Sequence, residues 1–298
     1  MINTSSLVFR QQIVPNGLLV AIGGNEDKEY DLQILSTILS LVKKQNKRIE
    51  IITTASRYSE EAGQAYHKVF ARDSNHSVGL MHISSREQAN DASLVQRITA
   101  ADIVFFTGGY QLRITSVLGG SLLEREILRK YQQDVCIIAG TSAGASAMSK
   151  TMIYGGEGTI ALRKGTVKVS TGMGLIDNAI IDTHFVERGR FSRLMQVVSM
   201  NSGNTGIGLG EDAAIVIKGG CILRAIGSGI TVIFDGQHLK YTNVADIDFD
   251  EAIAIENLII HTIVNGYGYD LCENRYLKPD DLKKLDMDES EAKIHEDN

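Results

Sequence analysis

The first half of the chain alternates short apolar runs with segments in which apolar residues recur at helical spacing. The apolar runs lie at residues 18–22, 49–53, 78–83, 103–106 and 135–139. Periodic apolar positions between them predict helices over about 34–42, 60–71, 94–98 and 122–128. Short strands that are apolar on both faces and separated by helices are typical of a parallel sheet covered on both sides. The pattern therefore predicts an α/β fold with a mostly parallel, doubly wound sheet.

The second half follows a different pattern. Residues 151–175 are rich in glycine, which predicts a loop or flap. From residue 213 onward the pattern predicts β-hairpins, with apolar runs on both sides of Lys218-Gly219-Gly220. The end of the chain is charged and polar, so we expect a flexible acidic tail over about 280–298. No repeat or linker divides the sequence, and we expect a single domain over residues 1–298.

Composition argues against several classes of function. The formal net charge of -6 leaves no basic excess to bind the phosphates of a nucleic acid. No run approaches the ~18 apolar residues of a membrane span, and the amino terminus lacks the pattern of a secretory signal. The cysteines, Cys136, Cys221 and Cys272, have no zinc-ligand spacing. We expect them to be buried thiols in a reducing cytoplasm.

Candidate chemistry begins at the pentapeptide Gly140-Thr141-Ser142-Ala143-Gly144, which follows an apolar run and precedes small residues. This context predicts a strand, a tight turn and a helix, with the Ser142 hydroxyl exposed at the edge of the sheet. The alternative is a glycine-rich turn that carries an idle serine. If Ser142 is a nucleophile, the backbone N–H groups of Ala143 and of the Gly108-Gly109 turn are candidates for an oxyanion site.

A serine nucleophile needs a base, and the base needs an acid that orients it. Among the seven histidines, His184 stands apart because it follows the strand-like run 179–181 and lies beside three arginines. Glu211 follows a glycine-rich stretch and is a candidate acid, with the adjacent Asp212 as the alternative. The order serine, histidine, glutamate differs from the order serine, acid, histidine of α/β-hydrolases, which argues against that fold.

Arginines cluster directly after His184. Apolar residues at 191, 194, 195 and 198 predict the core face of a helix, and Arg190 and Arg193 lie on the flank of that face, with Arg188 just before it. Clustered guanidinium groups with few interleaved acids indicate a carboxylate-binding pocket. The alternative is a solvated basic helix face whose charges pair with acids elsewhere in the chain.

Several ordered blocks together resemble one family of serine peptidases, the cyanophycinases, which are related to the aspartyl dipeptidase called peptidase E. The blocks are residues 21–28, 106–113, 139–148, 152–157, 182–194 and 206–211. The block His-Phe-x-x-Arg-x-Arg-x-x-Arg-Leu that begins at His184 separates cyanophycinases from peptidase E. The resemblance implies a sheet like that of class I glutamine amidotransferases.

The resemblance also implies an activity. It implies a serine-type exopeptidase that hydrolyses cyanophycin, a poly-aspartate with arginine on each β-carboxylate, to β-Asp-Arg dipeptides through an acyl-enzyme. Ser142 would be the nucleophile, His184 the base and Glu211 the orienting acid. No metal or cofactor is implied, and we expect a cytoplasmic homodimer. The alternatives are a peptidase for short aspartyl or isoaspartyl peptides and a non-catalytic binding relative.

The positions that match the family's substrate pocket are Gln111, Asp182, Thr183, Arg188, Arg190 and Arg193. Gly109 and Ala143 match the oxyanion positions. Two residues depart from the family pattern, Tyr110 where the family has Asp or Asn and Thr183 where it often has Gln. The acid that would meet the substrate guanidinium stays open among Asp182, Glu157 and Glu26.

Overall fold

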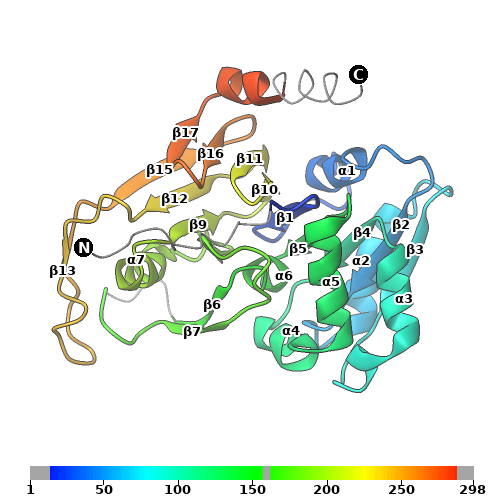
Figure 1. The fold of residues 1–298 in the computed structure, drawn as a ribbon, viewed down its shortest axis with the longest axis horizontal. Helices are drawn as coiled ribbons and strands as arrows, with labels where there is room; N and C mark the ends of the chain where they lie inside the picture. Colours follow the sequence, from blue (N-terminus) through cyan, green and yellow to red (C-terminus); the bar gives the residue numbers. More distant parts are fainter. Residues whose placement is uncertain (1–13, 157–161, 287–298) are drawn as a thin grey trace, which may run out of the picture.

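A nine-stranded mixed sheet forms the centre of the molecule, in the order β17-β16-β11-β10-β1-β5-β4-β2-β3 (Figure 1). It is seen in a computed structural model that describes residues 14–156 and 162–286. The parallel half consists of β1 (Leu18–Ile22), β5 (Ile137–Thr141), β4 (Ile103–Phe106), β2 (Arg48–Ile52) and β3 (Ser77–Met81). The antiparallel half consists of β10 (Ala213–Lys218), β11 (Ile222–Gly227), β16 (Gly268–Asp270) and β17 (Arg275–Leu277). The predicted α/β class, the mainly parallel sheet and the C-terminal hairpins are confirmed.

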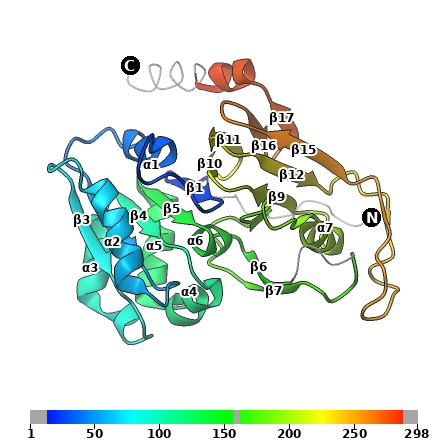
Figure 2. The ribbon, with the colours of Figure 1, turned by 180° about the vertical axis from the view of Figure 1, so that it is seen from behind.

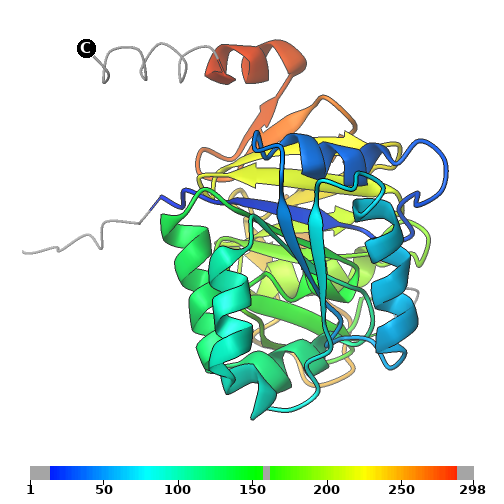
Figure 3. The same cartoon turned by 90° about the vertical axis from the view of Figure 1, so that its right-hand side faces the viewer.

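Helices cover both faces of the parallel half (Figure 3). One face packs against α1 (Gln33–Ser40) and α2 (Ser59–Phe70), and the other packs against α3 (Ala92–Ala100), α4 (Gln111–Leu118) and α5 (Leu122–Gln133). Alternate residues of each strand point to opposite faces. Val20 and Phe105 therefore join the first cluster, while Leu19 and Phe106 join the second. Burial on both faces explains why the strands appear in the sequence as continuous apolar runs.

A second sheet, which the sequence did not predict, lies beside the first. Its order is β15-β12-β9-β8, with β8 (Ala179–Asp182), β9 (Thr205–Leu209), β12 (Thr231–Asp235) and β15 (Ile259–Ile263). Helix α7 (Phe191–Met200) packs on it through Leu194 and Val198. Two glycines make this packing possible, because a Cβ at Gly206 would lie 2.7 Å from Val198 and one at Gly208 would lie 2.4 Å from the Phe185 ring.

Two ribbons extend from this second region. Residues 151–175, predicted as a loop or flap, contain the antiparallel pair β6 (Thr151–Gly155) and β7 (Lys168–Thr171), and residues 157–161 lie outside the described part. A long arm carries β13 (Tyr241–Thr242) and β14 (Ile255–Glu256), and it is visible on the right of Figure 2. The short η1 (Gln88–Asn90) and α6 (Ala143–Ser146) complete the described elements.

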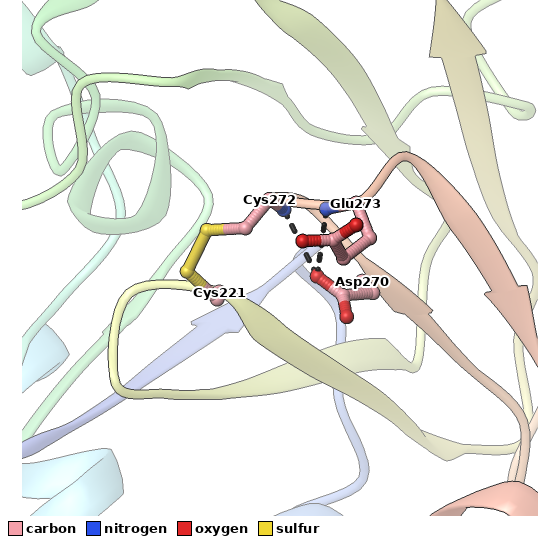
Figure 4. Close-up of a disulfide and its surroundings, with 4 residues drawn as sticks. All are labelled: Cys221, Asp270, Cys272 and Glu273. Atoms are coloured by element: carbon pink, nitrogen blue, oxygen red, sulfur yellow. Dashed lines mark hydrogen bonds between the residues drawn. A yellow bond between two sulfur atoms is a disulfide. The ribbon is translucent and has the colours of Figure 1, made fainter.

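The cysteines correct one prediction. Cys221 and Cys272 form a disulfide, with their Cα atoms 5.3 Å apart, and are not thiols (Figure 4). The bond closes because Ile222 pairs with Asp270 in the sheet, which brings the turns beyond both strand ends together. Because the two cysteines are 51 residues apart in the sequence, no local pattern predicts that they meet. Cys136 is a free, buried cysteine, and burial raises the pKa of its thiol to about 11.

The polar end of the chain is more ordered than the sequence predicted. Residues 279–286 are helical, and Leu282 is buried beside Gly268. The rest of the expected tail, residues 287–298, lies outside the described residues. No helix in the described ranges is long and apolar enough to span a bilayer.

Candidate active site

Ser142 occupies a sharp turn between β5 and α6, as predicted. Its backbone has φ 51° and ψ -110°, a conformation that non-glycine residues rarely adopt and that is found at functional sites. The flanking glycines let the turn close, because a Cβ at Gly140 would lie 2.7 Å from the Gly144 carbonyl carbon. A Cβ at Gly144 would lie 2.6 Å from the Phe106 oxygen. The turn therefore presents the Ser142 hydroxyl at the carboxyl edge of the sheet.

The second sheet brings His184 and Glu211 to this hydroxyl. His184 follows β8, and its Nε2 lies 2.9 Å from Ser142 Oγ. Its Nδ1 lies 2.8 Å from Oε1 of Glu211, which follows β9. A carboxylate can only accept hydrogen bonds, so Nδ1 carries the proton and Nε2 is free to accept the serine proton. The three residues predicted from the sequence therefore form one hydrogen-bonded chain.

The structure also separates Glu211 from Asp212, which the sequence left as alternatives. Asp212 points away from His184, and its carboxylate accepts hydrogen bonds from the Asp27 N–H at 3.2 Å and the Ser228 hydroxyl at 2.5 Å. The hydrogen bond from His184 lowers the pKa of Glu211, and a second one from Asn25 adds to the effect. Glu211 is therefore an anion at neutral pH and stabilises positive charge on His184.

The predicted oxyanion groups lie beside Ser142. Ala143 begins α6, and the first N–H groups of a helix have no partner within it. The loop between β4 and α4 passes close to the serine, since a Cβ at Gly108 would lie 3.4 Å from Ser142 Cβ. Gly109 has φ 145°, and a Cβ there would collide with the Ala55 carbonyl at 2.2 Å. An oxyanion role for Gly109 and Ala143 stays a prediction.

The arginine cluster divides into three environments. Arg193 is buried and forms a two-pronged ion pair with buried Asp182, in which Nε lies 2.6 Å from Oδ2. Arg190 is half-buried, donates to the Thr183 carbonyl at 2.5 Å and lies 3.5 Å from Asp182. Burial and the neighbouring Arg193 and Arg188 outweigh Asp182 and lower the pKa of Arg190 to about 10. Arg188 is exposed.

These contacts give Asp182 a structural task, because Arg193 occupies both of its oxygens. Thr183 is buried, and its hydroxyl lies 3.5 Å from that of Ser146. Gln111 donates from Nε2 to the Ile153 carbonyl at 2.8 Å and so joins α4 to β6. Direct contact of these three residues with a substrate stays a prediction.

Of the three acids considered for a substrate guanidinium, Glu26 is enclosed. It is 2% exposed and accepts hydrogen bonds from Tyr66 and Thr141. Asp182 is 1% exposed and is paired with Arg193. Glu157 lies outside the described residues. Within the described ranges, no group of three or more acidic, histidine or cysteine side chains is arranged to hold a metal ion.

Sequence reasoning missed a pocket beside the Gly108-Gly109 turn. Its lining residues are Ala55, Ser56, Arg57, Tyr58, Gly109 and Tyr110. Both aromatic side chains are exposed, Tyr58 by 74% and Tyr110 by 46%. The Tyr110 N–H donates to the Ala55 carbonyl at 2.9 Å, which joins the two loops that form the pocket. The one signal in the sequence was Tyr110 itself, a departure from the family pattern.

Comparison with known proteins identifies the family. The model of peptidase family S51 matches residues 18–224, a range that contains Ser142, His184 and Glu211. The chain belongs to peptidase family S51. The S51 chain is 31% identical to a cyanophycinase of Synechococcus elongatus over 86% of its own length and 79% of the relative's. It is 31% identical to a cyanophycinase of Nostoc sp. over 93% of both chains.

A solved structure has the same overall fold. The peptidase from an acI-B1 Actinobacterium superposes with a TM-score of 0.64 at 19% identity, over 87% of this chain and 98% of the other. At this identity the likeness concerns the fold alone. Membership of family S51 makes the protein a serine peptidase, similar to cyanophycinases, and a hydrolase.

Proposed function

We propose that this S51 peptidase is a cyanophycinase, which hydrolyses cyanophycin to β-Asp-Arg dipeptides. The observation that carries the proposal is the Ser142–His184–Glu211 chain, with Nε2 of His184 2.9 Å from the serine hydroxyl, next to a half-buried arginine cluster. Identity of 31% to cyanophycinases over most of the chain supports the same substrate class.

The proposed reaction has two steps. Ser142 Oγ attacks a backbone carbonyl of the aspartate chain while His184 Nε2 takes the hydroxyl proton, and Glu211 stabilises the resulting imidazolium. The N–H groups of Gly109 and Ala143 bind the oxyanion. His184 then gives its proton to the leaving amine, the peptide bond breaks, and an acyl ester remains on Ser142. A water molecule, deprotonated by His184, hydrolyses the ester and regenerates the serine.

The arginine cluster fits the charge of this substrate. Every side group of cyanophycin ends in a free arginine carboxylate, and guanidinium groups bind carboxylates in a two-pronged geometry. Burial lowers the pKa of Arg190 to about 10, so a carboxylate placed beside it stabilises its charged form. We propose that Arg190 and the exposed Arg188 contact the substrate carboxylate, while the Thr183 carbonyl and Asp182, itself paired with Arg193, hold Arg190 in place.

A product assay tests the proposal. Purified protein is incubated with insoluble cyanophycin, and separately with α-aspartyl and isoaspartyl dipeptides, and the products are analysed by mass spectrometry. We expect β-Asp-Arg from the polymer, and none from the Ser142→Ala protein. Turnover of the short peptides without any release from cyanophycin would favour the short-peptide alternative. Failure of a serine-reactive phosphonate to label Ser142 would favour a non-catalytic relative.

Two further predictions accompany this proposal. We predict that the protein forms a homodimer, and light scattering of the purified protein measures the mass that tests this. We also predict that the protein is located in the cytoplasm, which cell fractionation tests. The Cys221–Cys272 disulfide weighs against that location, because disulfides persist mainly in oxidising compartments.

A further inference from the structure

One short segment, residues 22–26, which begins at the last residue of β1, contacts all three parts of the candidate active site. The Ile22 carbonyl accepts a hydrogen bond from the Ser142 N–H at 2.9 Å. The Gly23 carbonyl accepts one from the His184 N–H at 2.8 Å. The Gly24 carbonyl accepts one from Asp212, the residue after Glu211, at 3.0 Å. Three consecutive carbonyls thus fix the backbones of three segments that are far apart in the sequence.

The next residue continues the pattern with its side chain. Asn25 has φ 50°, in the left-handed region that asparagine tolerates better than most residues. Its Nδ2 donates to Oε2 of Glu211 at 2.9 Å. His184 contacts the other oxygen, Oε1, at 2.8 Å. Both oxygens of Glu211 are therefore held, which fixes the plane of the carboxylate toward His184.

Glu26 anchors the end of the segment inside the protein. Its carboxylate accepts hydrogen bonds from the Tyr66 hydroxyl at 2.5 Å and the Thr141 hydroxyl at 2.8 Å, and Lys28 lies 3.4 Å away. Burial and the nearby Glu26 raise the pKa of Tyr66, so its hydroxyl stays a donor. Thr141 directly precedes Ser142. The loop that carries Asn25 is thereby tied to the strand that carries the serine.

We propose that Asn25 is a positioning residue that extends the active-site chain to four members, Asn25–Glu211–His184–Ser142. Asn25 does not touch substrate, and it acts through the orientation of the Glu211 carboxylate. Without the amide donor, the carboxylate rotates to water and the imidazole loses its fixed orientation toward the serine. Errors of about 1 Å in such geometry lower rates by about 100-fold. The inference rests on the roles proposed above for Ser142, His184 and Glu211.

Two variants of Asn25 test the inference. Asn25→Gly removes the amide and keeps a residue that adopts positive φ without strain. Asn25→Asp keeps the shape but cannot donate to Glu211 while ionised. For both we expect kcat to fall about 10- to 100-fold with KM within about twofold of wild type. For Asn25→Asp we expect the loss of kcat relative to wild type to become smaller as the pH falls, because the introduced carboxyl, once protonated, can donate a hydrogen bond to Glu211.

Asn257 provides a matched control. It also has positive φ, 66°, and its Nδ2 donates to the His238 carbonyl at 2.7 Å, on the arm that carries β14. We expect Asn257→Asp to leave kcat unchanged. Circular dichroism checks that each variant folds. If Asn25→Asp does not fold, Asn25→Gly alone tests the inference. A kcat within twofold of wild type in a folded Asn25→Gly protein would overturn the inference.

A second readout separates this inference from the proposed substrate. The rate at which a serine-reactive phosphonate labels Ser142 depends on the active-site chain and needs no cyanophycin. We expect Asn25→Gly to slow labelling by the same factor as kcat. If wild type is labelled but releases nothing from cyanophycin, the proposed substrate is wrong, and the labelling rates of the variants still decide the role of Asn25.

Discussion

In the described part of the protein, two hydrogen-bonded chains of side chains each join a hydroxyl, a histidine and a glutamate. In the first, Ser142 lies 2.9 Å from His184, which lies 2.8 Å from Glu211. In the second, the Thr53 hydroxyl lies 2.7 Å from Nδ1 of His82, whose Nε2 lies 3.0 Å from Glu60. Both hydroxyls follow strands in the parallel half of the central sheet, β2 and β5, at the carboxyl ends of these strands.

The two hydroxyls differ in access and in backbone. Thr53 is completely buried, has no positive φ, and its N–H donates to the Met81 carbonyl at 3.2 Å. Ser142 is only half-buried and has φ 51° on a turn between a strand and a helix. Of the two hydroxyls, only that of Ser142 is accessible to a substrate. Hydrogen-bond connectivity therefore does not define a catalytic chain; exposure and an unusual backbone conformation at the nucleophile do.

Replacing the two hydroxyls gives the largest expected difference between the chains. Ser142→Ala removes the proposed nucleophile and lowers kcat by about 10⁶-fold, the scale of loss when a serine peptidase loses its nucleophile. Thr53→Val leaves kcat unchanged but costs about 0.5–1.5 kcal/mol of unfolding free energy, because the part-buried hydrogen bond to His82 is lost. Peptide hydrolysis and urea unfolding measure the two effects. Loss of activity in a folded Thr53→Val protein would contradict the comparison.

A glycine gives room to the histidine in each chain, and this allows a matched pair of smaller changes. A Cβ at Gly24 would lie 2.3 Å from Cε1 of His184, and one at Gly63 would lie 3.3 Å from Cε1 of His82. Gly24→Ala displaces the imidazole and lowers kcat about 100-fold. Gly63→Ala leaves kcat unchanged. Equal activity of both alanine variants in a hydrolysis assay would show that the position of His184 is not critical.

The smallest expected effect concerns stability and pH. The pKa of Glu211 is lowered from its ordinary 4.5 by the hydrogen bond from His184. A carboxyl whose pKa is lower in the folded than in the unfolded protein stabilises the fold. This stabilisation is complete at pH values above the pKa of the unfolded state, and it is lost as the pH falls through the pKa of the folded state. We expect the unfolding free energy of wild type at pH 7 to exceed that of Glu211→Gln by at most about 1 kcal/mol, because the pair is partly exposed. This difference shrinks below about pH 4.5.

Urea unfolding at pH 7 and at pH 3 measures this difference. A difference between wild type and Glu211→Gln that stays constant across this pH range would show that the His184 contact does not stabilise the ionised carboxylate.

Local sequence determined the elements that build the first half of the molecule. The strands at residues 18–22 and 103–106 have the predicted bounds, and the helix after His184 begins at Phe191. Of its predicted core face, Leu194 and Val198 are buried, whereas Phe191 is exposed. Both strands are buried along nearly their whole length, so each appears in the sequence as a run of neighbouring apolar residues. The glycines on both sides of Ser142 predicted the turn in the same way, because a tight turn between a strand and a helix needs small residues at these neighbouring positions.

The second sheet escaped prediction for a local reason as well. The stretch 206–210 stands out in the sequence only as rich in glycine, and glycine is uncommon inside strands, so the pattern does not indicate β9. In the structure β9 needs Gly206 and Gly208 because α7 and the Phe185 ring pack directly against its backbone. The demand for glycine there comes from elements that are distant along the chain.

Only the tertiary structure decided which side chains meet. The sequence by itself determined the strands, the helices, the Ser142 turn and a short list of candidates, because each depends on neighbouring residues. The choice of Glu211 over Asp212, the pairing of Asp182 with Arg193, the Cys221–Cys272 disulfide and the contact of Asn25 with Glu211 depend on strand order and sheet packing. Such contacts join residues far apart in the chain, and no local pattern records them.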